Sequence, residues 1–115
     1  MNIILFASGT GSNVYNIIQH FKSNDSINVV AVLCNKAGAG ALNHAKNAGI
    51  PTLTFSKEEL DNSIKVEEFL AERKVDLVIL AGFLLKVPQS LIDLYPNKII
   101  NLHPALLPDY GGKGM

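Results

Sequence analysis

The stretch Asn2-Ile3-Ile4-Leu5-Phe6-Ala7-Ser8-Gly9-Thr10-Gly11-Ser12-Asn13 decides the fold. Its apolar first half predicts a buried strand over Asn2–Ala7, and the two glycines after it predict a tight loop. A helix is predicted over Asn13–Phe21, with Ser12 or Asn13 as N-cap. Its apolar residues recur at helical spacing, namely Val14, Ile17, Ile18 and Phe21. A buried strand, a glycine loop and a helix in this order are typical of the first unit of an α/β protein.

The rest of the chain repeats this alternation of buried strands and helices. Further strands are predicted at Asn28–Cys34, Thr52–Phe55, Leu77–Ala81 and Ile99–Ile100, and further helices at Ala39–Ala48, Lys57–Arg73 and Pro88–Tyr95. Gly49 is placed to end the second helix, and in the third we expect four residues to face the core, namely Leu60, Ile64, Phe69 and Leu70. The pattern predicts an α/β fold of the Rossmann-like, doubly wound class, with a mainly parallel sheet and helices on both faces. The whole chain, residues 1–115, is expected to form a single domain.

Composition excludes several classes of function. Ten basic and ten acidic residues cancel, so no net charge attracts the chain to nucleic acid or to an anionic membrane. The apolar run Ile3–Ala7 is far shorter than the roughly 20 residues that span a bilayer, and no basic segment precedes it. Cys34 is the only cysteine, which excludes a disulfide within the chain and suits a reducing, cytoplasmic location. The three histidines, His20, His44 and His103, lie on separate elements, so no metal site is predicted.

The loop Ser8–Asn13 is the first candidate site. Glycines allow the backbone to approach an anion, and the N-terminus of the following helix offers free N–H groups and a positive partial charge. The alternative is that Gly9 and Gly11 only form a tight turn. A dinucleotide site would need a glycine where Val14 stands, and a carboxylate after the second strand, where Cys34-Asn35-Lys36 stands. We therefore predict a single phosphate monoester as the ligand and not NAD.

The second candidate site is Asn101-Leu102-His103-Pro104-Ala105-Leu106-Leu107-Pro108, which follows the last predicted strand. Side chains alternate along a strand, so Asn101 and His103 are expected to point the same way. Pro104 ends the strand because it has no N–H to donate. Such a pair suits a reaction in which one group polarises a carbonyl and another moves a proton. The alternative is a structural histidine that bonds to the backbone near the prolines.

Three segments together, Ser8–Asn13, Leu80–Phe83 and Asn101–Pro108, resemble the phosphoribosylglycinamide formyltransferases, folate-dependent enzymes of purine synthesis. The resemblance implies transfer of a formyl group from 10-formyltetrahydrofolate to the amine of glycinamide ribonucleotide. The resemblance further implies that Gly11, Ser12 and Asn13 hold the substrate phosphate. It also implies that Asn101 and His103 are catalytic, and that folate is bound by Asn101 and by the segment Leu84, Leu85, Lys86 and Val87.

The same resemblance implies a further catalytic aspartate beyond residue 115. Within the chain no carboxylate partner for His103 is assigned, because Asp109 is expected to face the outside of its loop. The chain stops within Tyr110–Met115, which has loop composition, so we expect it to be the N-terminal part of a longer formyltransferase. The 115-residue piece alone is expected to bind folate poorly and to be inactive. The sequence leaves the oligomeric state open.

Three alternatives compete with this interpretation. Methionyl-tRNA formyltransferase shares the folate chemistry but would be expected to carry a basic surface for RNA, which a net charge of zero does not provide. Formyltetrahydrofolate hydrolase usually has a regulatory domain before its catalytic part, and here the first strand begins at Asn2. A non-catalytic nucleotide-binding module would use Ser8–Asn13 but would leave Asn101 and His103 without a role.

Overall fold

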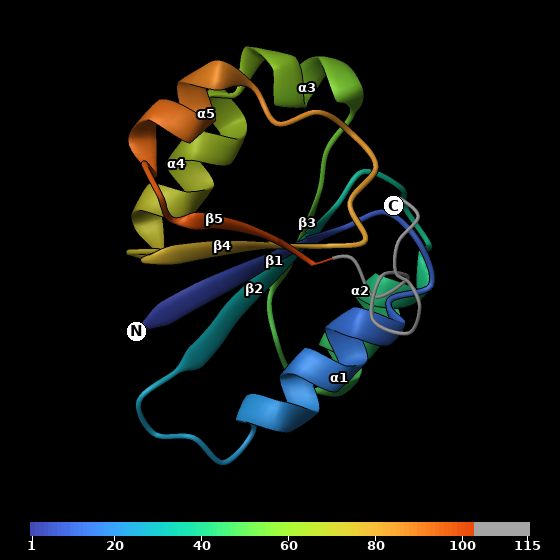
Figure 1. Ribbon diagram of the computed structural model, residues 1–115. Helices are drawn as coiled ribbons and strands as arrows, with labels where there is room; N and C mark the ends of the chain where they lie inside the picture. The colour runs from blue at the N-terminus through green and yellow to red at the C-terminus, as the bar shows by residue number, and fades with distance from the viewer. Residues whose placement is uncertain (103–115) are drawn as a thin grey trace, which may run out of the picture.

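A five-stranded sheet, parallel throughout, forms the centre of the molecule (Figure 1). The computed structural model describes residues 1–102, and residues 103–115, including His103, lie outside the described part. The strands run in the order β3-β2-β1-β4-β5. Their bounds are β1 Asn2–Ala7, β2 Asn28–Cys34, β3 Thr52–Thr54, β4 Leu77–Ala81 and β5 Ile99–Leu102. The predicted parallel sheet is confirmed.

Helices cover both faces of the sheet, as the doubly wound class requires. Helices α1 (Ser12–Phe21) and α2 (Gly40–Asn47) lie on one face. On the other face lie α3 (Lys57–Asn62), α4 (Ile64–Glu72) and α5 (Gln89–Leu94), as Figure 1 shows. The predicted fold class is therefore confirmed.

Alternation along β1 gives each layer of helices its own hydrophobic core. Ile3, Leu5 and Ala7 pack toward α1 and α2, where they meet the buried residues Val14, Ile18, Ala41 and Ala45. Ile4 and Phe6 pack toward α3, α4 and α5, where they meet Leu60, Val66, Leu70 and Leu91. Because both faces of β1 are buried, the strand reads as a continuous apolar run.

The strand order reverses direction at β1. From β1 the chain builds outward to β2 and β3, and it then crosses over to add β4 and β5 on the other side of β1. In open parallel sheets, ligands bind beyond the carboxyl ends of the strands at such a reversal point. The loops after β1 and β4 therefore lie where a ligand site is expected.

The predicted single helix over Lys57–Arg73 is wrong. Ser63 takes a left-handed conformation, with φ of 63°, and separates α3 from α4. Its side chain is buried, and its hydroxyl contacts the Glu67 carboxylate and lies 2.8 Å from the Ser90 hydroxyl of α5. Serine side chains form hydrogen bonds that compete with helical geometry, and the spacing of apolar residues gives no sign of such a break. The break also reverses one predicted core position, because Ile64 is 58% exposed and Val66 is buried instead.

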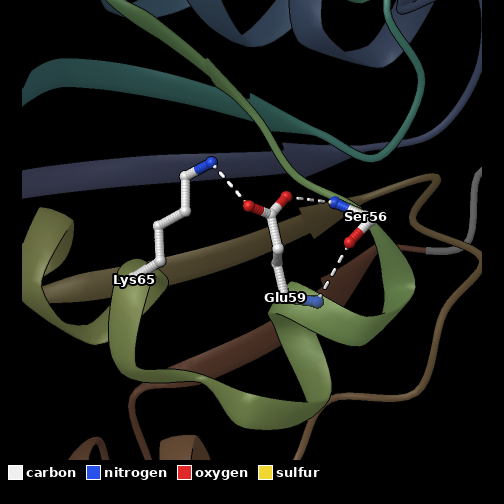
Figure 2. Close-up of polar contacts among 3 residues, drawn as sticks. All are labelled: Ser56, Glu59 and Lys65. Atoms are coloured by element: carbon white, nitrogen blue, oxygen red, sulfur yellow. Dashed lines mark hydrogen bonds and ion pairs between the residues drawn. The ribbon is translucent and has the colours of Figure 1, made fainter.

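A capping box fixes the start of α3 (Figure 2). The Ser56 hydroxyl accepts from the Glu59 N–H at 3.1 Å, and the Glu59 carboxylate accepts from the Ser56 N–H at 2.8 Å. Ser56→Ala should lower the free energy of unfolding by about 1 kcal/mol, because one helix N–H loses its acceptor. Urea denaturation measures this, with Ser56→Asp as the control that keeps an acceptor. Equal losses in both variants would contradict the capping role.

Glu59 also links α3 to α4, because its second oxygen lies 2.9 Å from Lys65 Nζ (Figure 2). The hydrogen bond from Lys65, followed by those from Ser56, holds the pKa of the Glu59 carboxyl below its usual value. A lowered folded-state pKa stabilises the fold above the unfolded-state pKa, and this contribution is lost as the pH falls through the folded-state value. The free energy of unfolding of Glu59→Gln should therefore be lower than that of wild type at neutral pH, and the two values should converge in acid. A constant difference across a pH series of thermal melts would contradict the assignment.

Candidate functional site

Helix α1 begins directly at the glycine loop. Gly11, with φ of 83°, is its N-cap, so the prediction that Ser12 or Asn13 caps the helix is wrong. Gly11 takes this position because a left-handed backbone suits a residue without Cβ. The Tyr15 N–H makes the first helical bond, to the Gly11 carbonyl at 2.8 Å. The N–H groups of Ser12, Asn13 and Val14 have no backbone acceptor in the described chain, as is usual at a helix start.

The start of α2 presses against this loop and fixes its shape. The Ala41 N–H donates to the Gly9 carbonyl at 3.3 Å. A Cβ on Gly11 would lie 2.4 Å from Ala41 Cα, and a Cβ on Gly40 would lie 2.3 Å from the Thr10 carbonyl oxygen. Only glycine permits both approaches. Gly11 and Gly40 therefore do more than form a turn, because they let two helix starts meet around one loop.

The predicted folate-binding segment follows β4. Gly82 turns the chain with φ of 74°, and Phe83 then packs edge-on against Phe6, with ring centroids 5.3 Å apart. Beyond this anchor Leu84 is 75% exposed and Lys86 is exposed, while Leu85 and Val87 pack against the core. The segment thus offers one exposed apolar side chain and its backbone at the edge of the sheet.

Asn101 lies near the end of β5, with Leu80 of β4 as its register partner, and its side chain is exposed. Because the strands are parallel, β1, β4 and β5 all end at one edge of the sheet (Figure 1). The structure therefore brings Asn101 to the edge that carries the glycine loop and the segment Leu84–Val87. The predicted partner His103 and the expected outward-facing Asp109 lie outside the described residues.

A hydrogen-bonding centre at this edge has no counterpart in the sequence-based prediction. Ser8 is 1% exposed, and its hydroxyl donates to Asn35 Oδ1 at 2.6 Å and accepts from the Leu84 N–H at 2.9 Å. Asn35 and Leu84 follow β2 and β4, so the bonds join loops that are distant in sequence. The only signal in the sequence is a polar residue placed directly after a strand that is apolar to its end.

Other features lie away from this edge. A cleft of about 460 Å³ opens between the ends of α1 and α2 and the start of β2, and no described residue of the predicted site lines it. His20 is exposed, whereas His44 is half-buried, with its ring 5.1 Å from that of Tyr15. Within residues 1–102 no three His, Cys, Asp or Glu side chains are grouped as a metal site would require. No helix in that range has both the length and the apolar character needed to cross a membrane.

The fold and the edge define the chain as a Rossmann-like α/β domain with its candidate site at the reversal point of a parallel sheet. A sequence profile described as formyl transferase matches residues 1–115, and the chain belongs to that family. The family and fold implied by the sequence resemblance are thus confirmed.

Similar proteins carry a more specific name. The chain is 38% identical to the chloroplastic phosphoribosylglycinamide formyltransferase of Arabidopsis thaliana, over 98% of this chain and 41% of that protein. It is 37% identical to the phosphoribosylglycinamide formyltransferase of Escherichia coli, over 97% of this chain and 55% of that one. The crystal structure of the enzyme from Anaplasma phagocytophilum superposes with a TM-score of 0.85 at 35% identity, covering 99% of this chain and 55% of that one. The chain thus spans about half the length, or less, of these relatives.

Proposed function

We propose that the protein transfers the formyl group of 10-formyltetrahydrofolate to the amine of glycinamide ribonucleotide, a step of purine synthesis. The observation that carries this proposal is the convergence of three segments on one sheet edge. These are the glycine loop, the segment Leu84–Val87 and Asn101. The names of the similar proteins support the same reaction.

The phosphate of the ribonucleotide is assigned to Gly11, Ser12 and Asn13. The free N–H groups of the first turn of α1 supply donors, and the helix dipole favours an anion there. Gly11 has no side chain to obstruct the approach. The loop is also held by α2 through the bond between Ala41 and Gly9, so little conformational entropy is lost on binding.

The folate is assigned to Leu84, Leu85, Lys86 and Val87, together with Asn101. Leu84 presents the exposed apolar contact, while the core packing of Leu85 and Val87 keeps the backbone of the segment in place. Aromatic heterocycles bind well to such a surface, where apolar contact is combined with backbone donors and acceptors.

In the reaction, the substrate amine attacks the formyl carbon and the carbonyl oxygen becomes an oxyanion. The Asn101 side-chain N–H donates to that oxygen, a role worth about 3 kcal/mol in comparable sites. His103 stabilises the same oxygen as imidazolium, or passes a proton from the amine to the leaving folate nitrogen. The tetrahedral adduct then collapses, with the bond to the folate nitrogen breaking and the formyl group remaining on the product amine. We assign no metal to the reaction.

The remaining parts of the proposal concern the protein as a whole. Residues 1–115 form the nucleotide-phosphate-binding and catalytic domain at the N-terminal part of a longer formyltransferase, whose later residues supply the assisting acid. The location is cytoplasmic, and the ligands are small molecules, with neither nucleic acid nor membrane as partner. The free, buried Cys34 is consistent with a reducing compartment.

The direct test offers three acceptors to the full-length gene product with 10-formyltetrahydrofolate. These acceptors are glycinamide ribonucleotide, methionyl-tRNA and water. Formation of the formylated ribonucleotide, with little reaction of the other two, is the expected result. Formylation of the tRNA or release of formate alone would assign the protein to one of the two related activities. Binding of the ribonucleotide without any turnover would favour the non-catalytic module.

A further inference from the structure

Ser8 lies buried at the centre of the candidate site. It follows β1, and it is one of two polar residues that are fully buried among those described, the other being Ser63. Its hydroxyl is used twice, as donor to Asn35 Oδ1 and as acceptor for the Leu84 N–H. A buried hydroxyl with both functions satisfied has a fixed orientation, and removing it leaves two polar groups without a partner.

These two bonds connect the loops that the proposed reaction must align. Ser8 itself begins the glycine loop, and Leu84 begins the segment assigned to folate. Asn35, which follows β2, accepts the other hydrogen bond of the Ser8 hydroxyl. The strands fix only the starting points of these loops, because within residues 1–102 the strand pairing ends at Ala7 in β1 and at Ala81 in β4. The bond between Ser8 and Leu84 is therefore a direct tie between the two proposed substrate subsites.

We propose that Ser8 is a positioning residue, which sets the folate segment at a defined distance from the phosphate loop and so aligns the formyl carbon with the attacking amine. The inference rests on the proposed function. Small displacements of two bound reactants cause large losses of rate, since the attack needs a defined approach. Ser8 thus acts through Leu84 and not by contact with either substrate.

The glycine loop is also held by contacts with α2, so the effect of the Ser8 hydroxyl on the folate segment can be measured apart from any effect on the phosphate loop. Gly9 accepts from Ala41, and Gly11 lies against the backbone of Ala41. Neither contact depends on the Ser8 hydroxyl. Leu84, by contrast, has its N–H bonded to Ser8 and its side chain exposed. Loss of the hydroxyl should therefore loosen the folate segment and leave the phosphate loop in place.

The test compares wild type, Ser8→Ala and Ser8→Thr as full-length proteins. For Ser8→Ala we expect the Kd of a folate analogue to rise and kcat/KM to fall, each by about tenfold, because a buried hydrogen bond is lost. The Kd of glycinamide ribonucleotide should change by less than about threefold. Ser8→Thr keeps the hydroxyl and should recover most of the loss. Hydrogen exchange at the Leu84 amide should be faster in Ser8→Ala alone.

Ser63→Ala is the matched control, since it also removes a buried hydroxyl with two partners, and Ser63 ends α3 and contacts neither Ser8, Asn35 nor Leu84. It should lower stability without changing folate affinity. If Ser8→Ala does not fold, Asn35→Ala removes only one of the two bonds, and its folate Kd should rise by about threefold. Wild type that forms no formylated ribonucleotide would overturn the proposed function and this inference with it. Active wild type with Ser8 variants that bind folate normally would overturn the inference alone.

Discussion

Asn101→Ala in the full-length protein is expected to lower kcat for formyl transfer by about 100-fold to 1000-fold, which is the effect of removing one oxyanion donor. The side chain is exposed at the end of β5, so its loss should leave the core intact. The Kd of glycinamide ribonucleotide should stay within about twofold of the wild-type value, because the assigned phosphate loop follows β1 and Asn101 lies in β5. Single-turnover kinetics and calorimetry measure the two quantities separately.

The matched control for this variant is Asn97→Ala. Asn97 is an exposed asparagine just before β5, so this variant removes the same side chain at the other end of the strand, and its left-handed φ of 60° should cost stability but not turnover. It should keep normal turnover. An Asn101→Ala enzyme with near-normal kcat would remove Asn101 from the chemistry, and the same measurement on His103→Ala applies to the second predicted catalytic residue.

Gly11→Ala is expected to have the second large effect, on both folding and phosphate binding. The new Cβ would lie 2.4 Å from Ala41 Cα on a backbone with φ of 83°. Left-handed strain and backbone overlap together should lower the free energy of unfolding by about 2–5 kcal/mol. The first turn of α1 must also move away from α2, so the Kd of glycinamide ribonucleotide should rise by at least about tenfold.

Alanine variants of two other glycines separate the backbone strain from the overlap with Ala41. A Cβ on Gly9 would meet nothing within 4 Å, and Gly38 has φ of 80° but is equally open. Gly9→Ala should therefore be nearly neutral for stability, and Gly38→Ala should lose only the strain energy, about 1 kcal/mol. Urea denaturation of the three variants gives the comparison. Equal losses at positions 11 and 38 would show that the close approach of α2 to the loop contributes nothing.

The strands were predictable because their chemistry is local. The run Ile3–Ala7 is apolar without interruption, and a short apolar run before a glycine loop is typical of a strand buried on both faces. The same holds for Leu77–Ala81. Right-handed crossovers limit the possible strand orders but do not select a single one. The sequence also placed Asn101 correctly at a carboxyl strand end.

Features that depend on contacts between distant residues were not predictable. Ser63 breaks a helix because it contacts Ser90, which is 27 residues away. Gly40 is an ordinary position of the predicted helix Ala39–Ala48 until α2 is seen against Thr10. Ser8 has a role only because three strands bring Asn35 and Leu84 to it. Periodicity and propensity describe what a residue does in its own element, and these residues act between elements.

The decisive experiment for the proposed site is a crystal structure of the full-length protein with glycinamide ribonucleotide and a folate analogue. We expect the ribonucleotide phosphate on the N–H groups of Gly11, Ser12 and Asn13, and the folate ring against Leu84–Val87. The Asn101 amide should point to the space between them. A ribonucleotide bound in the cleft between α1 and α2, or an imidazole at His103 turned away from both ligands, would contradict the proposed site.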